Sequence, residues 1–251
     1  MTGYPAPATS GPIQPRTYTV SELLDTVFKV YRRNFDLFAV ISLMLALPDV
    51  LFLLLGLHAY SGLMRFSLAP YFMATLFLAA AHVIYRGPAR ATDILLAGFR
   101  RYGSFAGVYA GLILAAIGLI ILPLGVWALV RWAPATAVLA AEPVKPRQAF
   151  KRSAELVHGL WWRAFGIVAA VVVLELVLEV ILGASAGIAV LLIPGLDLLA
   201  KAMAASVLAT VVGSLVVPLG PIALTLLYVD LRVRKEGMDL DSLAKSATDA
   251  A

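Results

Sequence analysis

Six long apolar runs constrain the fold of this chain more than any other feature of its sequence. A helix needs about 20 apolar residues to cross the roughly 30 Å hydrocarbon layer of a bilayer. With 61% hydrophobic and only 14% charged residues, the chain cannot hide these runs in the core of a soluble domain. The sequence therefore predicts an all-α transmembrane bundle of six helices, at residues 37–57, 66–85, 105–122, 124–141, 164–182 and 202–231.

Prolines and glycines indicate how the longest runs are divided. The third and fourth spans form one apolar stretch, in which Pro123 and Gly125 predict a tight hairpin. The last run is too long for one straight span, and Pro218 and Pro221 predict a bend because each proline removes a backbone donor. Residues 187–199 are too short to cross, so we interpret them as an interfacial or re-entrant segment on the outer side.

The basic residues predict the orientation of the bundle. Lys and Arg favour the cytoplasmic ends of short loops. With both termini in the cytoplasm, most of the 20 Lys and Arg residues fall on the inner side, Arg65 and Lys201 fall outside, and Arg131 lies within a span. We therefore expect a multi-pass protein with both termini cytoplasmic.

The domain boundaries follow from composition. Residues 1–18 are rich in proline and lack a basic segment before an apolar core, so we expect a disordered tail and no signal peptide. Residues 19–236 form the predicted transmembrane domain, and residues 237–251 a cytoplasmic tail. The net charge of +5 lies in clusters beside apolar runs, which favours anionic lipid headgroups as partners and argues against nucleic acid. The absence of cysteine excludes disulfides and thiolate metal sites.

Short amphipathic segments precede pairs of spans. Thr19 and Glu22 have the spacing of a capping box at a helix start, and similar segments lie at residues 93–101 and 146–162. We expect these helices to lie at the cytoplasmic interface. Their spacing suggests three degenerate repeats of one surface helix and two spans. In the third segment, the expected membrane-interface residues are Phe150, Lys151, Arg152, Trp161, Trp162 and Arg163.

Three stretches of the sequence carry a family resemblance: SELLDTVFKVYRRNF, PVKPRQAFKRSAELVHGLWWRAFGIV and LTLLYVDLRVRKEGMDL. Together they resemble the bacterial integral membrane proteins named for the membrane domain of glycerophosphoryl diester phosphodiesterases. The resemblance implies a six-helix domain in the bacterial inner membrane. Few residues follow the last apolar run, so we expect no phosphodiesterase barrel and no enzymatic activity.

Two sets of residues stand out within the spans. Gly103, Gly107 and Gly111 share one helix face, where missing side chains allow close packing inside the bundle, dimerisation or contact with a partner. Charged residues within spans normally pair or line a wet pathway, because their insertion is costly. We therefore expect a polar cluster in the outer half of the membrane, either a structural ion cluster with an Arg131–Glu175 contact or a ligand or ion site, formed by Asp49, Arg131, Glu175 and Glu179.

Catalytic and metal signatures are weak. Residues 183–187 match G-x-S-x-G, but they follow an apolar helix among small residues, so we interpret them as a simple turn. His82 could hold a metal or pigment, although a hydrogen bond between helices suits an isolated histidine better. We expect no catalytic residue, metal or cofactor. The sequence favours a non-enzymatic scaffold that engages lipids or membrane subunits; the alternative is a small transporter or lipid-handling protein with an outer polar pocket.

Overall fold

The computed structural model describes residues 16–118 and 122–236, with side chains throughout except at residues 58, 59, 61, 62, 122 and 123. All regular structure in these ranges is helical, which confirms the predicted class. The helices are α1 (Val20–Arg33), α2 (Phe35–Leu54), α3 (His58–Tyr85), α4 (Ala91–Arg100), α5 (Tyr102–Ile117), α6 (Leu122–Trp132), α7 (Ala135–Ala141), α8 (Pro146–Val157), α9 (Trp161–Leu191), α10 (Leu198–Ser214) and α11 (Leu219–Glu236).

Five helical segments among the described residues are long and apolar enough to cross a membrane, as a multi-pass protein requires. α5 is apolar but spans only 16 residues. Its neighbour α6 begins at Leu122, so Pro123 and Gly125 lie within this helix and do not form the hairpin turn that was predicted there. Residues 119–121 lie outside the described ranges. The five segments are Phe35–Leu54, Leu63–Tyr85, Leu124–Ala141, Trp161–Leu191 and Leu198–Glu236.

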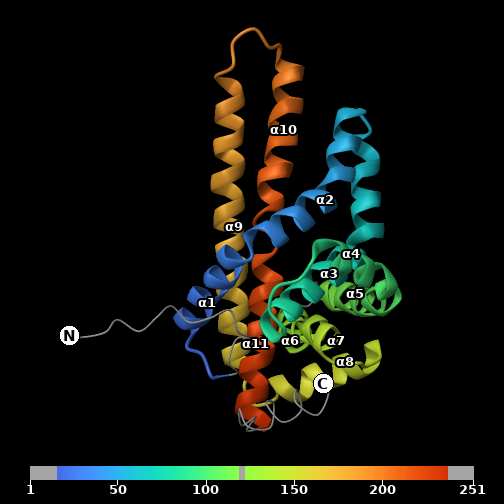
Figure 1. Cartoon of the computed structure of the whole chain (residues 1–251), viewed down its shortest axis with the longest axis vertical. Coiled ribbons are helices and arrows are strands. Elements are labelled where there is room, and N and C mark those ends of the chain that lie inside the picture. The colour runs from blue at the N-terminus through green and yellow to red at the C-terminus, as the bar shows by residue number, and fades with distance from the viewer. Residues whose placement is uncertain (1–15, 119–121, 237–251) are drawn as a thin grey trace, which may run out of the picture.

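Two helical hairpins rise from a compact base (Figure 1). The taller hairpin consists of α9 and α10, and the shorter one of α2 and α3. The base contains α4 to α8 and α11, which continues below α10 (Figure 1). Only 11% of the most apolar window of α9 is buried inside the protein. Most of the apolar surface of α9 is therefore exposed on the outside of the protein.

The core of the base is built around α11. This helix contacts α1, α3, α7, α8 and α9, and its apolar side chains between Leu219 and Leu231 are almost all buried. The short helix α7 is buried as well, and its residues are mostly alanine, which permits close approach of its neighbours. The C-terminal helix therefore organises the packing of segments from the whole chain.

The tall hairpin differs from the predicted arrangement. α9 continues through Gly183 and Gly187 to Leu191, and α10 already begins at Leu198, so residues 187–199 are not a separate interfacial segment. The prediction was wrong because nothing between residues 183 and 191 breaks a helix, whereas Pro194 and Gly195 do. The predicted bend near Pro218 is confirmed, since α10 ends at Ser214 and α11 starts at Leu219.

The first helix begins as predicted. Thr19 Oγ1 accepts a hydrogen bond from the Glu22 backbone N–H (3.2 Å), and the Thr19 N–H donates to Glu22 Oε2 (2.8 Å), which completes a capping box. The chain is already packed before this helix, because Tyr18 is buried. The packed part of the described chain therefore includes Tyr18.

Candidate functional site

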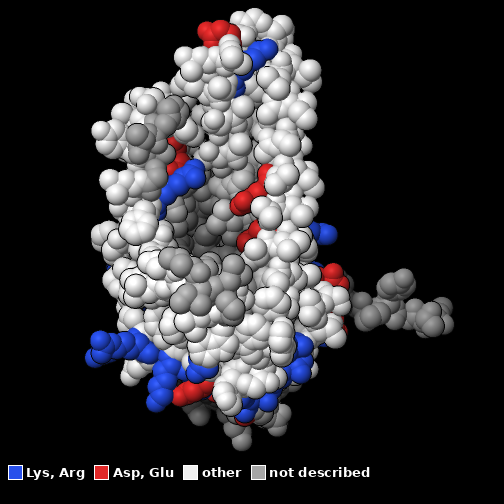
Figure 2. All heavy atoms as spheres, turned by 180° about the vertical axis from the view of Figure 1, so that it is seen from behind, with Lys and Arg blue, Asp and Glu red and all other residues white. Residues whose placement is uncertain are grey.

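A cavity of about 690 Å³ lies between the two hairpins, where α2 and α3 face α9 and α10. Most of its lining is apolar, and charged side chains enter it from α2, α3 and α9. Figure 2 shows the hollow from the opposite side to Figure 1, with acidic and basic side chains on its walls. A concave, mainly apolar site with a few converging polar groups is the usual form of a small-molecule pocket.

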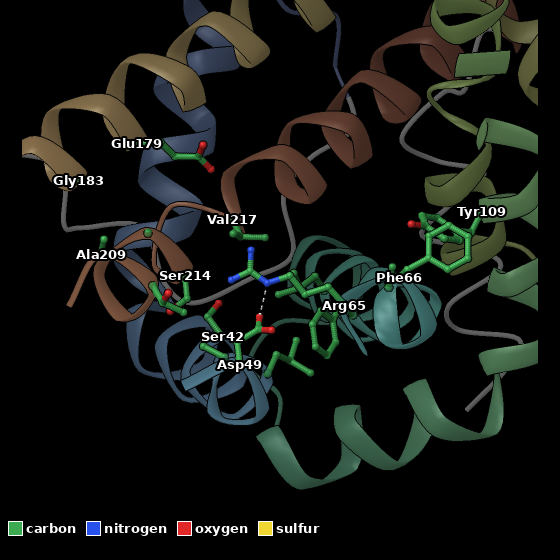
Figure 3. Close-up of a pocket in the computed structure, with 17 residues that line it drawn as sticks. Ser42, Asp49, Arg65, Phe66, Tyr109, Glu179, Gly183, Ala209, Ser214 and Val217 are labelled. Atoms are coloured by element: carbon green, nitrogen blue, oxygen red, sulfur yellow. Dashed lines mark hydrogen bonds and ion pairs between the residues drawn. The ribbon is translucent and has the colours of Figure 1, made fainter. Parts of the chain in front are cut away.

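An ion pair forms one wall of this cavity. Arg65 Nε of α3 donates to Asp49 Oδ2 of α2 across 2.7 Å. Asp49 is buried, whereas 56% of the Arg65 side chain is exposed, and the guanidinium points into the cavity (Figure 3). Its two terminal nitrogens make no hydrogen bond to any residue that the structure describes. The pair therefore keeps donor groups available to a ligand.

Glu179 of α9 forms the opposite wall. Its carboxylate points into the same space as the Arg65 guanidinium (Figure 3). It makes no ion pair within residues 16–118 and 122–236. Glu179 is exposed, so its carboxylate is available to a cation or a hydrogen-bond donor that enters the cavity.

A serine hydroxyl adds an unsatisfied polar group to the site. Ser42 of α2 lines the cavity, is only 3% exposed, and its Oγ has no hydrogen-bond partner among the described residues. Buried hydroxyl groups are nearly always hydrogen-bonded, and leaving one unpaired costs about 1–3 kcal/mol. The Ser42 hydroxyl is therefore a further position at which a bound polar group would be stabilised.

The structure separates the predicted polar cluster into parts. Asp49 and Glu179 share the cavity, as expected, but Glu175 lies one turn before Glu179 and is used elsewhere. A Glu175 oxygen stands 2.7 Å from the position that a Cβ on Gly220 would occupy, beside the Gly220 backbone amide in the first turn of α11. A carboxylate there satisfies free amides and the positive end of the helix dipole. Glu175 therefore has a structural role.

Arg131 does not join the cluster. Its guanidinium lies over the Trp127 ring, 4.9 Å from the ring centroid, and its backbone carbonyl accepts a hydrogen bond from Ser153 of α8 (2.9 Å). No ion pair joins Arg131 to either glutamate in the described chain, so the predicted Arg131–Glu175 pair is absent there. The sequence indicated how far Arg131 lies from the end of its helix. It did not indicate which side of the helix Arg131 occupies.

Arg65 takes the role that was predicted for Arg131, and sequence reasoning missed it. The signal was available: Asp49 and Arg65 lie seven residues before and nine residues after Gly56, the middle of the turn between α2 and α3. In a hairpin of two antiparallel helices, residues at similar distances from the turn lie at a similar level. The pairing could therefore have been inferred from the position of the turn.

The predicted glycine face packs inside the protein. A Cβ on Gly111 would stand 2.4 Å from the Phe150 ring of α8, and a Cβ on Gly107 would stand 3.0 Å from Pro146. Gly103 has nothing within 4 Å of its own Cβ position. Two of the three glycines therefore allow α8 to pack closely against α5, as the packing interpretation expected, and Gly103 has no such contact.

Some of the predicted interface residues of α8 and α9 contact other residues of the protein, and the others are exposed on its surface. Arg152 pairs with Glu142 and Glu236, and Phe150 packs edge-on against Trp132 with 5.3 Å between ring centroids. Arg163 binds Asp230 and thus also points inward. The basic side chain of Lys151 and the ring of Trp162 are largely exposed, and Trp161 is partly covered by Phe165. Phe150, Arg152 and Arg163 thus make contacts within the protein, and the position of the six residues at a membrane interface stays a prediction.

A second polar cluster, which no sequence pattern indicated, closes the base. The Asp230 carboxylate of α11 is fully buried. It accepts hydrogen bonds from Arg163 of α9 (2.8 and 3.1 Å), from Arg234 one turn later (3.2 Å) and from the backbone N–H of Tyr18 (2.8 Å). Both arginines also donate to the Tyr18 carbonyl oxygen. The Asp230 carboxylate thus joins the chain at Tyr18 to α9 and α11, and we call these groups the structural clamp.

Neither a nucleophile elbow nor a metal site emerges in the described chain. Gly183 to Gly187 are helical, so the strand, sharp turn and helix that an elbow requires are missing there, and the predicted simple turn is missing too. His82 lies half-buried in the last turn of α3. No group of three or more metal-ligating side chains occurs among the residues that the structure describes.

The fold and the cavity thus define a helical membrane protein with a polar-walled pocket between two hairpins. Comparisons with protein-family models, with curated proteins and with solved structures find no match to this chain. The chemistry of the cavity is therefore the basis on which a function can be assigned.

Proposed function

We propose that this chain is a non-enzymatic membrane protein that binds a lipid-like amphiphile in the cavity between the two hairpins. The observation that carries this proposal is the combination of an apolar lining with the Asp49–Arg65 pair and the Glu179 carboxylate in one open cavity. An amphiphile has an apolar part for the lining and a polar part for the charged walls. This lipid-handling function is the alternative that the sequence left open.

The proposed placement in the membrane follows the distribution of charge. Figure 2 shows most Lys and Arg side chains at the lower end of the molecule, around the base, and the cytoplasmic side of a membrane attracts such residues. We take this end as cytoplasmic, with both termini there, in the inner membrane of a bacterium. Glu179 lies 15 residues after Ala164, which is about 22 Å along a helix in a hydrocarbon layer about 30 Å thick. The cavity would then open in the outer leaflet.

Six crossings and three repeats are part of the same proposal. The order of the helices supports it, because α1, α4 and α8 are short and each precedes two apolar segments. In this arrangement α5 is the sixth crossing, shortened to 16 residues. The resemblance to the membrane domain of the phosphodiesterase family supports the same layout. A C-terminal reporter should be active in the cytoplasm, and activity only in the periplasm would overturn the six-crossing layout.

The binding function can be tested by filling the cavity. Gly183 lines the cavity and has nothing within 4 Å of its Cβ position, so Gly183→Phe should place a ring in the cavity without disturbing α9. Val180 on the same helix is exposed and lies outside the lining, so Val180→Phe is the matched control. Native mass spectrometry in mild detergent should detect one bound phospholipid on the wild type and on Val180→Phe, and much less on Gly183→Phe. Equal lipid binding by all three proteins would contradict the proposal.

A scaffold function is the second candidate, favoured by the tall hairpin. α9 and α10 extend beyond the rest of the molecule (Figure 1) and expose apolar side chains along their length, among them Leu192 and Leu198 near the tip. Another membrane subunit could pack against this surface through van der Waals contacts. Co-purification of a stoichiometric membrane subunit that is lost on substitution of the exposed hairpin face, with no dependence on the cavity, would favour the scaffold.

A further inference from the structure

Negatively charged side chains outnumber positively charged ones in the lining of the cavity, and this excess indicates which class of headgroup the cavity can bind. Asp49 and Arg65 neutralise each other, which leaves the Glu179 carboxylate in excess among the described residues. An anionic headgroup would bring further negative charge beside Glu179, at a site where the low dielectric strengthens repulsion. A ligand that carries a cation suits this wall of the cavity.

The opposite wall suits an anion of a particular shape. The Arg65 guanidinium donates through Nε to Asp49, and its terminal nitrogens point into the cavity. A guanidinium binds phosphate oxygens with two parallel donors. The buried Ser42 hydroxyl, which lacks a partner among the described residues, lies on the same side of the cavity and can donate to another phosphate oxygen. The cavity therefore presents phosphate donors on one wall and an ammonium acceptor on the other.

The apolar lining supplies the third element of recognition. Leu45, Phe66, Phe72 and Leu76 line the cavity beside the charged groups, and the hollow is open on one face of the molecule (Figure 2). Burying acyl methylene groups against such side chains is favourable by about 0.8 kcal/mol each. The open side lets the remainder of each chain stay in the bilayer.

We propose that the cavity selects a zwitterionic phospholipid with a primary ammonium headgroup, of the phosphoethanolamine class. Its phosphate binds the Arg65 terminal nitrogens and the Ser42 hydroxyl, and its ammonium donates to Glu179. This inference rests on the proposed function and specifies its ligand. A quaternary ammonium lacks N–H donors and a glycerol headgroup lacks a cation, so phosphocholine and phosphoglycerol lipids should bind more weakly.

The test uses the full chain, freed of lipid in mild detergent and titrated with dioleoyl lipids that differ only in the headgroup. The wild type should bind the phosphoethanolamine lipid about tenfold more tightly than the phosphoglycerol lipid, because a charge-assisted hydrogen bond is gained. Glu179→Gln should lose this preference. Glu175→Gln, one turn away on the same helix and outside the cavity lining, should keep it. Glu179→Gln should melt close to the wild-type temperature, whereas Glu175→Gln should melt lower because it removes the carboxylate beside the Gly220 amide.

The outcomes separate this inference from the proposed function. Equal binding of the phosphoethanolamine, phosphocholine and phosphoglycerol lipids, or a preference that persists in Glu179→Gln, overturns the proposed headgroup selection. If Gly183→Phe still blocks binding in that case, the cavity remains a lipid-binding site. Lipid binding that Gly183→Phe leaves unchanged overturns both proposals. Soluble glycerophosphoethanolamine is the remaining arm: if it competes at the concentration of the lipid itself, the ligand is a free headgroup and the lipid assignment fails.

Discussion

The backbone N–H of Tyr18 donates to the buried carboxylate of Asp230 across 2.8 Å, and this hydrogen bond joins residues 212 positions apart in the chain. Arg163 and Arg234 donate to the same carboxylate and to the Tyr18 carbonyl oxygen. One side chain of α11 thereby holds the entry of α1 and the start of α9. The carboxylate is fully buried, so these donors take the place of water around its oxygens.

Replacing Asp230 by Asn should destabilise the protein strongly. The substitution leaves two partly buried guanidinium groups without their carboxylate, and breaking such a buried pair costs about 3–5 kcal/mol. The melting temperature in detergent measures the loss. Asp25→Asn is the control, since Asp25 is an exposed carboxylate on α1. Equal melting temperatures of the two variants would show that the clamp contributes nothing to stability.

The three glycines of α5 should respond differently to alanine. Gly111→Ala places a methyl group against the Phe150 ring, which is held by Trp132, and such overpacking costs about 1–3 kcal/mol. Gly103→Ala meets open space and should leave stability unchanged or raise it by about 0.5–1 kcal/mol, because alanine favours the helix. Thermal unfolding of both variants checks the difference. A lower stability of Gly103→Ala than of Gly111→Ala would refute the packing of α8 on this face.

Arg131 and Glu175 should behave as independent residues. In the described chain the Arg131 guanidinium lies over the Trp127 ring, and the Glu175 side chain of α9 lies beside Gly220 at the start of α11. The two residues therefore share no contact. The effects of Arg131→Leu and Glu175→Leu on the free energy of unfolding should add to within about 0.5 kcal/mol in the double variant. A double-mutant cycle measures this, and a coupling free energy well above that value would restore the ion pair that the sequence suggested.

The capping box of α1 should contribute a pH-dependent stabilisation. Hydrogen bonds from the Thr19 backbone and then from its hydroxyl lower the pKa of the Glu22 carboxyl below its usual range. A lowered folded-state pKa means that the stabilisation is complete above the unfolded pKa of about 4.3 and is lost as the pH falls through the folded value. The difference in melting temperature between wild type and Glu22→Ala should therefore be largest near neutral pH and shrink in acid. A difference that grows in acid would contradict this assignment.

Local patterns in the sequence predicted the structural features that are determined by residues close together in the chain. The apolar runs predicted the helices, Thr19 and Glu22 predicted the capping box, and Pro218 predicted the interruption before α11. Each of these features is decided within one or two turns of backbone. The end of α9 was missed because a span of about 20 residues was assumed, although no residue before Pro194 stops the helix.

The candidate site was predicted only in part, because its residues come from different helices. Counting residues from a turn gives the depth of a charge in the membrane, and that count placed Asp49, Arg131 and Glu175 at one level. It does not give the rotation of a helix or the identity of its neighbour. Arg131 was therefore paired with the wrong partner, and Arg65, which lies across the α2–α3 turn from Asp49, was assigned to an external loop.

The clamp on Tyr18 also constrains how the protein is made. Ribosomes deliver α1 first and α11 last, so the apolar stripe of Leu23 and Val27 must wait for its partner until nearly the whole chain has been inserted. Until then α1 has only its smaller contacts with α2 and α9. Chains interrupted before α11 would expose an undocked N-terminal helix, which quality-control proteases can recognise, whereas finished chains would conceal it.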